Sequence, residues 1–360
     1  MFLLMEEIMN IVFVLPMAQK APVGGYEVVY EYANRLVNDH NISILYLNDA
    51  PLSNLKLPES MKCIIKHFLT MMRPAWFKLD NRIKKISAYD YNLKNSIRDT
   101  DVAICTGIDT VNRTIEIFNK VQCKFAYFIQ DYENWEATDE YCHYTYGLGM
   151  TNIVVSNWLK NIVDKYSVSP SILIKNPIDL NVYKIQTPIE SRKLHTIGLL
   201  YHRMPYKGLK YSLEALRIIK MEYPDLEVYM FGIPQKPKDF PSWIHYIHNA
   251  KQQQTVAIYN KVSVWLCASV DEGFGLTGFE AMACGDALVS TAYAGVFEYA
   301  KDGYNALLSP VKNVGALVKN VERLFEDDNL RKFLVDNAQK SIKAFSWDVA
   351  VNKLEKAISE

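Results

Sequence analysis

Two glutamates, Glu272 and Glu280, are separated by seven residues in the glycine-rich stretch DEGFGLTGFEAMACG, residues 271–285. The apolar run VSVWLCAS before it is typical of a strand and TGFEAMA of a helix, so the loop lies where a strand ends and a helix begins. Backbone N–H groups and the positive end of a helix dipole bind phosphate at such a point, and Gly273 and Gly275 let the backbone approach closely. Carboxylates accept paired hydrogen bonds from vicinal hydroxyls. We therefore predict a phosphate site between two glutamates that bind hydroxyls.

Glu280 also has a purely local interpretation. Thr277 and Glu280 fit a T-x-x-E capping box, in which the glutamate would only cap the start of its helix. Glu272 has no such role, because it precedes the loop, where a charge supports neither strand nor helix.

Apolar strands alternate with amphipathic helices along the whole chain, beginning with NIVFVLP and the helical pattern that follows Gly24 and Gly25. The runs ISILYL, DVAICTG, KFAYFIQD and NIVVSN are nearly continuous and apolar, as in parallel strands buried on both faces. The alternation stops at residues 176–193 and then restarts. We predict two doubly wound, Rossmann-like α/β domains, residues 1–178 and 179–345, that face each other across a cleft. A last helix, residues 346–360, is expected to pack toward the N-terminal domain.

Composition limits the function further. The 360 residues include 40 Lys and Arg and 40 Asp and Glu, and this balance disfavours a nucleic-acid binder. Six scattered cysteines without a C-x-x-C pair indicate buried thiols in a reducing compartment. The start, MFLLMEEIMN, lacks the basic region and cleavage site of a signal peptide, and no apolar run is long enough to span a bilayer. We expect a cytoplasmic protein.

The stretch EGFGLTGFEAMACG resembles the E-x-seven-E signature of the retaining glycosyltransferases of family 4, which have the GT-B fold. FGIP, VGALVKNVERLFED, AYAGVFEYAKDGYNALLSP and FSW extend the resemblance over the second half. It implies that Glu272 contacts the donor sugar and Glu280 the ribose. It also implies a donor site completed by Phe274, Gly275, Leu276 and Thr277, and a loop with Gly24 and Gly25 that closes over the diphosphate and acceptor.

The same resemblance implies two cations at the diphosphate. The family has an arginine and a lysine ahead of a K-G that opens a helix, and HRMPYKG offers Arg203 and Lys207 with three residues between them rather than four. Such cations would stabilise a departing diphosphate. The alternative is a solvated loop with a lysine at a helix start.

On the first domain, the strand KFAYFIQD ends in Gln130 and Asp131, where the family usually has a histidine. The segment Q-D-Y-E resembles that of the rhamnosyltransferases within the family. We expect Asp131 to bind a substrate hydroxyl or act as a base. Alternatively, Asp131 caps the following turn.

Three other patterns are weaker. Asp99 and Asp101 form a D-x-D in the ordinary place for an aspartate turn, and His245 and His248 lie on a predicted strand that would send them to opposite faces, so no metal site is predicted. There is no G-x-G-x-x-G after the first strand, and a dehydrogenase is therefore disfavoured.

Residues 66–98 are basic and aromatic. Their cations outnumber Asp80 and Asp90, and aromatic residues such as Phe68, Trp76 and Phe77 are interleaved. This composition is compatible with peripheral contact with an anionic membrane, and equally with a solvated helix pair whose aromatic rings lie in the core.

Together these features predict a glycosyltransferase that moves a hexosyl unit from a nucleoside diphosphate sugar to a hydroxyl of a glycan or lipid-linked acceptor, with retention and without a metal or other cofactor. A rhamnosyl donor on dTDP is the first specific expectation. The alternatives are a nucleotide-sugar epimerase of GT-B architecture and a non-catalytic nucleotide-sugar-binding subunit. The expected location is the cytoplasm, at the inner membrane face if residues 66–98 contact lipid.

Overall fold

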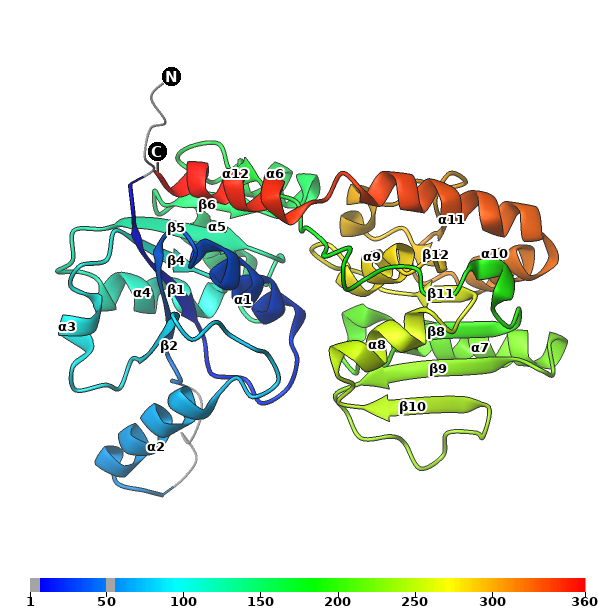
Figure 1. Cartoon of the computed structure of the whole chain (residues 1–360), viewed down its shortest axis with the longest axis horizontal. Coiled ribbons are helices and arrows are strands. Elements are labelled where there is room, and N and C mark those ends of the chain that lie inside the picture. The colour runs from blue at the N-terminus through cyan, green and yellow to red at the C-terminus, as the bar shows by residue number, and fades with distance from the viewer. Residues whose placement is uncertain (1–6, 50–55, 360) are drawn as a thin grey trace. The chain divides into compact units, whose positions relative to one another are not determined.

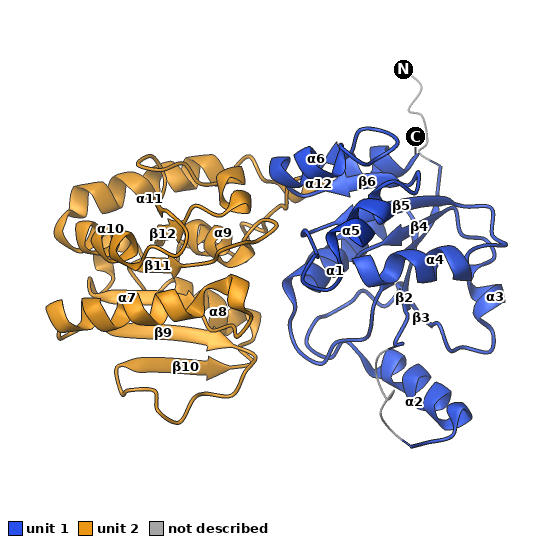
Figure 2. Ribbon diagram, turned by 180° about the vertical axis from the view of Figure 1, so that it is seen from behind, with its two compact units in different colours: residues 1–174, 351–360 blue, residues 175–350 orange. Residues whose placement is uncertain are grey.

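The structure, a computed structural model, describes residues 7–49 and 56–359 and separates into two compact units (Figure 2). Unit 1 comprises residues 1–174 and 351–360, and unit 2 comprises residues 175–350. The expectation about a signal peptide concerns a segment whose first six residues lie outside the described ranges.

Unit 1 is built on a parallel sheet with the strand order β3-β2-β1-β4-β5-β6-β7. Its strands are β1 (Asn10–Leu15), β2 (Asn41–Tyr46), β3 (Lys84–Ser87), β4 (Val102–Cys105), β5 (Lys124–Ile129), β6 (Thr151–Val154) and β7 (Ile172–Leu173). Its helices are α1 (Gly24–Leu36), α2 (Glu59–Met72), α3 (Leu93–Ile97), α4 (Val111–Ile117), α5 (Asp139–Tyr146) and α6 (Asn157–Val163), with a 3-10 turn η1 (Ile108–Thr110). The order reverses direction between β1 and β4, as in a doubly wound fold.

Unit 2 repeats this arrangement with the strand order β10-β9-β8-β11-β12-β13, which can be followed in Figure 1. Its strands are β8 (Thr196–Leu200), β9 (Glu227–Gly232), β10 (Ile244–His248), β11 (Val264–Cys267), β12 (Ala287–Thr291) and β13 (Leu307–Ser309). Its helices are α7 (Leu209–Glu222), α8 (Gln252–Tyr259), α9 (Leu276–Ala283), α10 (Val314–Glu326) and α11 (Asp328–Ile342), with 3-10 turns η2 (Ile189–Ser191), η3 (Pro205–Lys207) and η4 (Ala294–Glu298). The final helix, α12 (Trp347–Ser359), begins in unit 2 and continues into unit 1.

Both faces of the second sheet are covered. On one face, Leu199 and Leu266 share a core with Leu216 of α7 and Leu317 of α10. On the other, Trp265 packs edge-on against Tyr259 of α8 with 4.7 Å between ring centroids. Every residue of β11 and β12 is buried, which explains their unbroken apolar sequences. The predicted pair of doubly wound domains is confirmed.

Two local details differ from the sequence expectations. Helix α1 begins at Gly24, so Gly24 and Gly25 form its first turn rather than a loop. Strand β3 was not predicted, because KKIS begins with two lysines and lies at the sheet edge, where Lys84 is exposed and only Ile86 and Ser87 are buried. The last helix has a side-chain N-cap, since Ser346 Oγ accepts a hydrogen bond from Val349 N at 3.2 Å.

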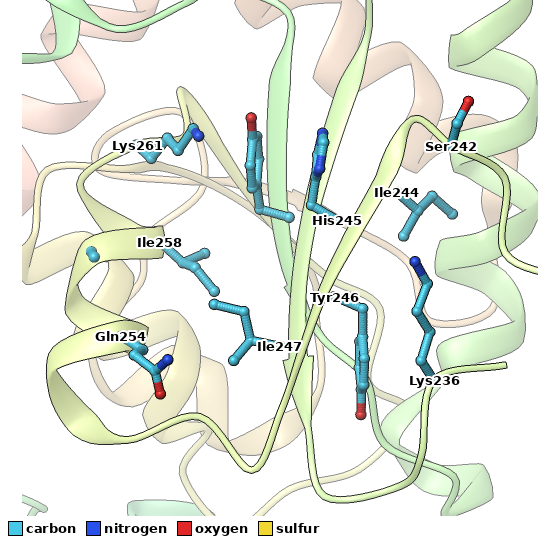
Figure 3. Close-up of a pocket in the computed structure, with 11 residues that line it drawn as sticks. Lys236, Ser242, Ile244, His245, Tyr246, Ile247, Gln254, Ile258 and Lys261 are labelled. Atoms are coloured by element: carbon cyan, nitrogen blue, oxygen red, sulfur yellow. The ribbon is translucent and has the colours of Figure 1, made fainter.

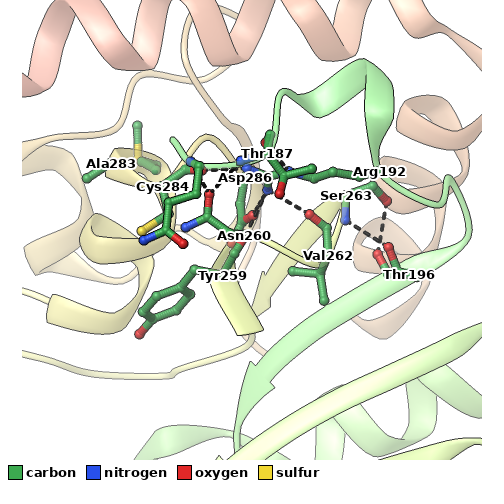
Figure 4. Close-up of polar contacts among 12 residues, drawn as sticks. Thr187, Arg192, Thr196, Tyr259, Asn260, Val262, Ser263, Ala283, Cys284 and Asp286 are labelled. Carbon is green, nitrogen blue, oxygen red and sulfur yellow. Dashed lines mark hydrogen bonds and ion pairs between the residues drawn. The ribbon is translucent and has the colours of Figure 1, made fainter. Parts of the chain in front are cut away.

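A buried ion pair connects the segments of unit 2 (Figure 4). The side chains of Arg192 and Asp286 have no exposed surface. One guanidinium nitrogen, Nη1, contacts Asp286 and also donates to the carbonyl oxygens of Tyr259 and Val262, each at 2.8 Å. The other, Nη2, donates to the carbonyl of Cys284. Arg192 thus joins the ends of α8 and α9 to the segments that lead into β11 and β12.

Within the described residues, no helix is both long enough and apolar enough to cross a membrane.

We expect Arg192→Met to lower the free energy of unfolding by about 3–5 kcal/mol, because it leaves the buried carboxyl group of Asp286 and the carbonyl oxygens that Arg192 binds without their partner. Urea unfolding followed by circular dichroism measures this change. The control is Lys193→Met, which removes an exposed pair with Glu227 (Nζ to Oε1, 2.7 Å) and should change the free energy by less than about 1 kcal/mol. Equal unfolding midpoints for the two variants would contradict the anchoring role of Arg192.

Candidate functional site

The predicted donor residues of unit 2 lie at the point where its strand order reverses. Strands β8 and β11 are neighbours there, paired at Ile197 with Val264. The loop after β8 carries Lys207, and the loop after β11 carries Glu272. Ligands of doubly wound sheets bind at the carboxyl ends of the strands at this reversal.

Lys207 and Glu272 form an ion pair between these two loops. Lys207 Nζ lies 2.9 Å from Glu272 Oε2. Ser269 Oγ donates to the other carboxylate oxygen, Oε1, and Glu272 is only 7% exposed. A buried carboxylate with one cation and one hydroxyl is fixed in orientation, with its charge balanced in the absence of a ligand.

Backbone contacts hold the two loops together. Val270 N donates to Tyr206 O at 2.7 Å, which joins the loop after β11 to the 3-10 turn η3 that carries Lys207. Thr291 Oγ1, at the end of β12, donates to Ser269 O. The Lys207–Glu272 contact is therefore a property of the loop framework and not only of two flexible side chains.

The glycine-rich loop is packed so closely that neither Gly275 within it nor Gly295 beside it could carry a side chain. Gly275 has φ +92°, and a Cβ there would lie 1.9 Å from Tyr293 Oη. At Gly295 a Cβ would meet the carbonyl oxygens of Glu272 and Gly273 at 2.5 and 2.6 Å. Tyr299 Oη donates to Gly275 O at 2.9 Å. The loop backbone thus has one conformation set by its surroundings.

The remaining donor-side residues are placed at the start of α9. Leu276 and Thr277 are its first two residues, with Gly275 as N-cap. The ring of Phe274 is buried against Phe279 and Tyr299, so this residue offers a ligand its backbone rather than its side chain.

Glu280 accepts a hydrogen bond from Tyr259 Oη at 2.7 Å. The capping-box interpretation is wrong, because the N-cap is Gly275 and Thr277 already lies inside the helix. Glu280 is partly exposed, and its carboxylate is positioned from α8 rather than by its own helix start. Sequence reasoning missed Tyr259, which has no motif of its own.

The two predicted cations differ in their surroundings. Lys207 contacts Glu272, whereas Arg203 is exposed and its charge acts on Tyr246 of β10, where it opposes the burial that raises the pKa of Tyr246 to about 12. The sequence also missed His202, which directly follows Tyr201 at the end of β8. Burial and the nearby Lys207 ammonium lower the pKa of His202, with Glu272 opposing them.

In unit 1 the predicted residues follow the carboxyl ends of β1 and β5. Gln130 Nε2 donates to Gly25 O at 3.1 Å, which ties the end of β5 to the first turn of α1. Asp131 Oδ1 accepts from Tyr132 N at 2.9 Å, as the turn-capping alternative requires.

Glu133 is a second carboxylate in this region that sequence reasoning did not select. Its Oε2 accepts from Ile108 N at 2.6 Å and lies 3.4 Å from Tyr127 Oη. Burial, with repulsion from Asp109 and Asp131, raises the pKa of Glu133 to about 8. Burial likewise raises the pKa of Asp109 to about 6. Unit 1 thus presents a carboxyl group that holds its proton near neutral pH.

The weaker motifs lie elsewhere. Asp101 Oδ2 accepts from Asn10 N at 2.7 Å, at the amino ends of β1 and β4. His245 and His248 lie on strand β10, as predicted. Among the described residues, no three or more His, Cys, Asp or Glu side chains are grouped so that they could hold a metal ion.

A hollow of about 520 Å³ lies beside β10 and α8 (Figure 3). Lys236, His245 and Lys261 line it, and none of the predicted site residues does. It is a separate surface at the edge of the second sheet.

Part of the second unit resembles a known protein family. Residues 190–341 match the family model described as glycosyl transferases group 1. An uncharacterized glycosyltransferase of Methanocaldococcus jannaschii is 26% identical over 212 residues, which are 58% of this chain and 59% of that protein. A D-inositol 3-phosphate glycosyltransferase of Streptomyces bingchenggensis is 31% identical over 99 residues, 28% of this chain and 22% of that protein. The chain therefore matches less than two thirds of the length of either curated relative.

Solved structures cover nearly the whole chain. HepE of Anabaena, in complex with UDP and glucose, has a TM-score of 0.76 at 13% identity and covers 98% of this chain and 99% of its own. Sucrose-phosphate synthase of Thermosynechococcus elongatus has a TM-score of 0.74 at 13% identity, with coverage of 97% and 98%. These likenesses show the fold, which is GT-B.

Glu133 generates a prediction about pH. Between its ordinary pKa of 4.5 and the raised value of about 8, the folded chain keeps a proton that the unfolded chain releases. The free energy of unfolding should therefore fall as the pH rises through this window, by up to about 1.4 kcal/mol per pH unit. In Glu133→Gln this part of the slope should disappear, as measured by urea unfolding at a series of pH values.

The control for that series is Glu140→Gln, at an exposed position on α5. It should keep the wild-type slope. If Glu133→Gln also keeps it, the side chain of Glu133 is ionised in the folded chain and the raised pKa is wrong.

Proposed function

We propose that this chain is a glycosyltransferase that moves a hexosyl unit from a nucleoside diphosphate sugar to a hydroxyl of a glycan or lipid-linked acceptor. The observation that carries the proposal is the Lys207–Glu272 pair at the strand reversal of unit 2, inside the segment that matches the group 1 glycosyl transferases. The relatives named above support glycosyl transfer as the reaction class.

In the proposed reaction the bond between the anomeric carbon and the diphosphate oxygen breaks, the oxygen of the acceptor hydroxyl bonds to the anomeric carbon, and the hydroxyl proton passes to the departing diphosphate. Lys207 and the backbone N–H groups at the start of α9 stabilise the negative charge that develops on the diphosphate. When Lys207 turns to the diphosphate, the Glu272 carboxylate becomes available to the sugar hydroxyls. Arg203 would join this site through a change of its side-chain conformation.

The nucleoside is bound by the second glutamate. Glu280, oriented by Tyr259, accepts hydrogen bonds from the ribose. HepE is bound to UDP and glucose in its solved complex, which makes UDP a first nucleotide to test beside dTDP. A dTDP-rhamnose donor would leave Glu280 only the 3′-hydroxyl, since a deoxyribose lacks the 2′-hydroxyl.

Acceptor binding belongs to unit 1 in this proposal. The segment that follows β5 carries Asp131 and the protonated Glu133, one an acceptor and the other a donor of hydrogen bonds to sugar hydroxyls. Retention of the anomeric configuration, independence from metals and other cofactors, and a location at the cytoplasmic face of a membrane complete the proposal.

We expect one nucleoside diphosphate to raise the melting temperature by a few degrees without Mg²⁺. A ligand at about 100 times its dissociation constant adds roughly 2.7 kcal/mol. The measurement is a thermal-shift series with UDP, GDP, dTDP, CMP and NAD, each with and without Mg²⁺. A shift with NAD alone, or with no nucleoside diphosphate, would remove the basis of the proposal.

Glu272→Gln should lower the rate of sugar transfer by at least about tenfold, a loss of roughly 1.4 kcal/mol of transition-state stabilisation. The rate is measured as the release of nucleoside diphosphate, with and without acceptor, from a sugar donor that carries the nucleotide found in the thermal-shift series. Glu326→Gln, an exposed substitution on α10, should leave the rate unchanged. Donor rearrangement without acceptor would instead favour an epimerase, and binding without turnover a non-catalytic subunit.

A further inference from the structure

Helix α2 presents its apolar side to solvent. Met61, Ile64, Phe68, Met71 and Met72, here called the outer face of α2, recur at helical spacing and are between 38% and 69% exposed. In Figures 1 and 2 the helix projects from the body of unit 1. A contiguous apolar stripe of this kind on a projecting helix marks an interaction surface.

The side of α2 that faces the protein is polar. Along this helix, all of which the structure describes, the two buried residues are Lys66 and Thr70. Lys66 Nζ lies 3.9 Å from the centroid of the Tyr89 ring, and Thr70 Oγ1 accepts from Asn48 Nδ2 at 2.7 Å. The amphipathic pattern is thus inverted relative to a helix that packs its apolar face on its own core.

Polar contacts also hold the end of the helix. Lys85 Nζ donates to the carbonyl oxygens of Met71 and Arg73, and Arg73 Nη1 donates to Ala18 O at 3.1 Å. Because these contacts and those of Lys66 and Thr70 position α2, its outer face is available to a partner without a change in the unit.

The segment around α2 is strongly basic. Residues 56–98 contain ten Lys and Arg and three Asp and Glu, whereas the whole chain is balanced at 40 of each. Lys56, Lys78, Lys84 and Lys94 are among the exposed cations. An apolar stripe within a cationic segment complements a surface that is apolar inside and anionic outside.

We propose that the outer face of α2 inserts into the headgroup region of an anionic lipid bilayer and so binds unit 1 to the membrane. Symmetric pairing of this face with a second copy would bring two basic segments together, which the charge disfavours. The proposed membrane-binding surface comprises only part of the basic aromatic segment 66–98. Trp76 and Phe77 of that segment pack against Tyr30, with ring-centroid distances of 5.6 and 5.2 Å, and are not part of the surface. The proposal is independent of the reaction proposed above.

Vesicle sedimentation with the full chain tests this inference. The wild type should bind vesicles of phosphatidylcholine mixed with phosphatidylglycerol, bind phosphatidylcholine alone weakly, and lose affinity as salt is raised. The double variant I64S/F68S should partition at least about tenfold less into the anionic vesicles. Phe68→Trp should retain binding and show a blue shift of its added indole emission with those vesicles.

The matched control is M221S/F333S, which removes two exposed apolar side chains of α7 and α11. It should bind like the wild type. The proposal is overturned if the wild type does not bind anionic vesicles, if I64S/F68S binds as well as the wild type, or if the control loses as much. A lipid-free wild-type dimer that I64S/F68S dissociates would assign the face to a second copy instead.

Discussion

The arrangement of unit 2 around the glycine-rich loop depends on the buried contact between Arg192 and Asp286. The guanidinium binds backbone carbonyls at the ends of α8 and α9, where its positive charge also complements the negative ends of the two helix dipoles. Because Arg192 fixes the last turn of α9, it also fixes the direction of the helix axis and so the position of the first turn. Arg192 thus positions Leu276, the first residue of α9, although Arg192 itself lies outside the site.

Close packing also fixes the loop between β11 and α9, which carries the site residues. Gly295 lies against the carbonyl of Glu272, and Tyr299 holds the carbonyl of Gly275. Glu272 is therefore presented from a backbone whose conformation does not depend on a ligand. Preorganisation of this kind reduces the conformational entropy that binding must remove. Lys207 has the more exposed side chain of the pair.

Most of the strands, the presence of two doubly wound domains and the position of the glycine-rich loop could be predicted, because buried parallel strands require continuous apolar runs and because the loop is bounded by one strand and one helix. Other features depend on contacts between distant segments. The hydrogen bond from Tyr259 to Glu280 joins residues 21 positions apart, so no local pattern could indicate it. The local T-x-x-E pattern instead suggested a capping box, which does not form because Gly275 is the N-cap. The charge environment of Glu133 depends on Ile108 and Asp109. For α2, the sequence shows that the helix is amphipathic, but only the polar contacts of Lys66 and Thr70 reveal which side faces inward.

The return of the chain to unit 1 has a consequence for biosynthesis. Lys124 Nζ donates to Ser359 O at 2.5 Å, and Glu355 Oε1 lies 3.3 Å from His40 Nε2, so the first unit is closed by residues that follow the whole of the second. Unit 2 is one continuous segment, residues 175–350, so all of its residues are available as soon as that segment leaves the ribosome. Unit 1 also needs residues 351–360 of α12, which leave the ribosome last. The N-terminal half is thus translated first and completed last, and until α12 has emerged the surface of unit 1 that α12 covers is left exposed.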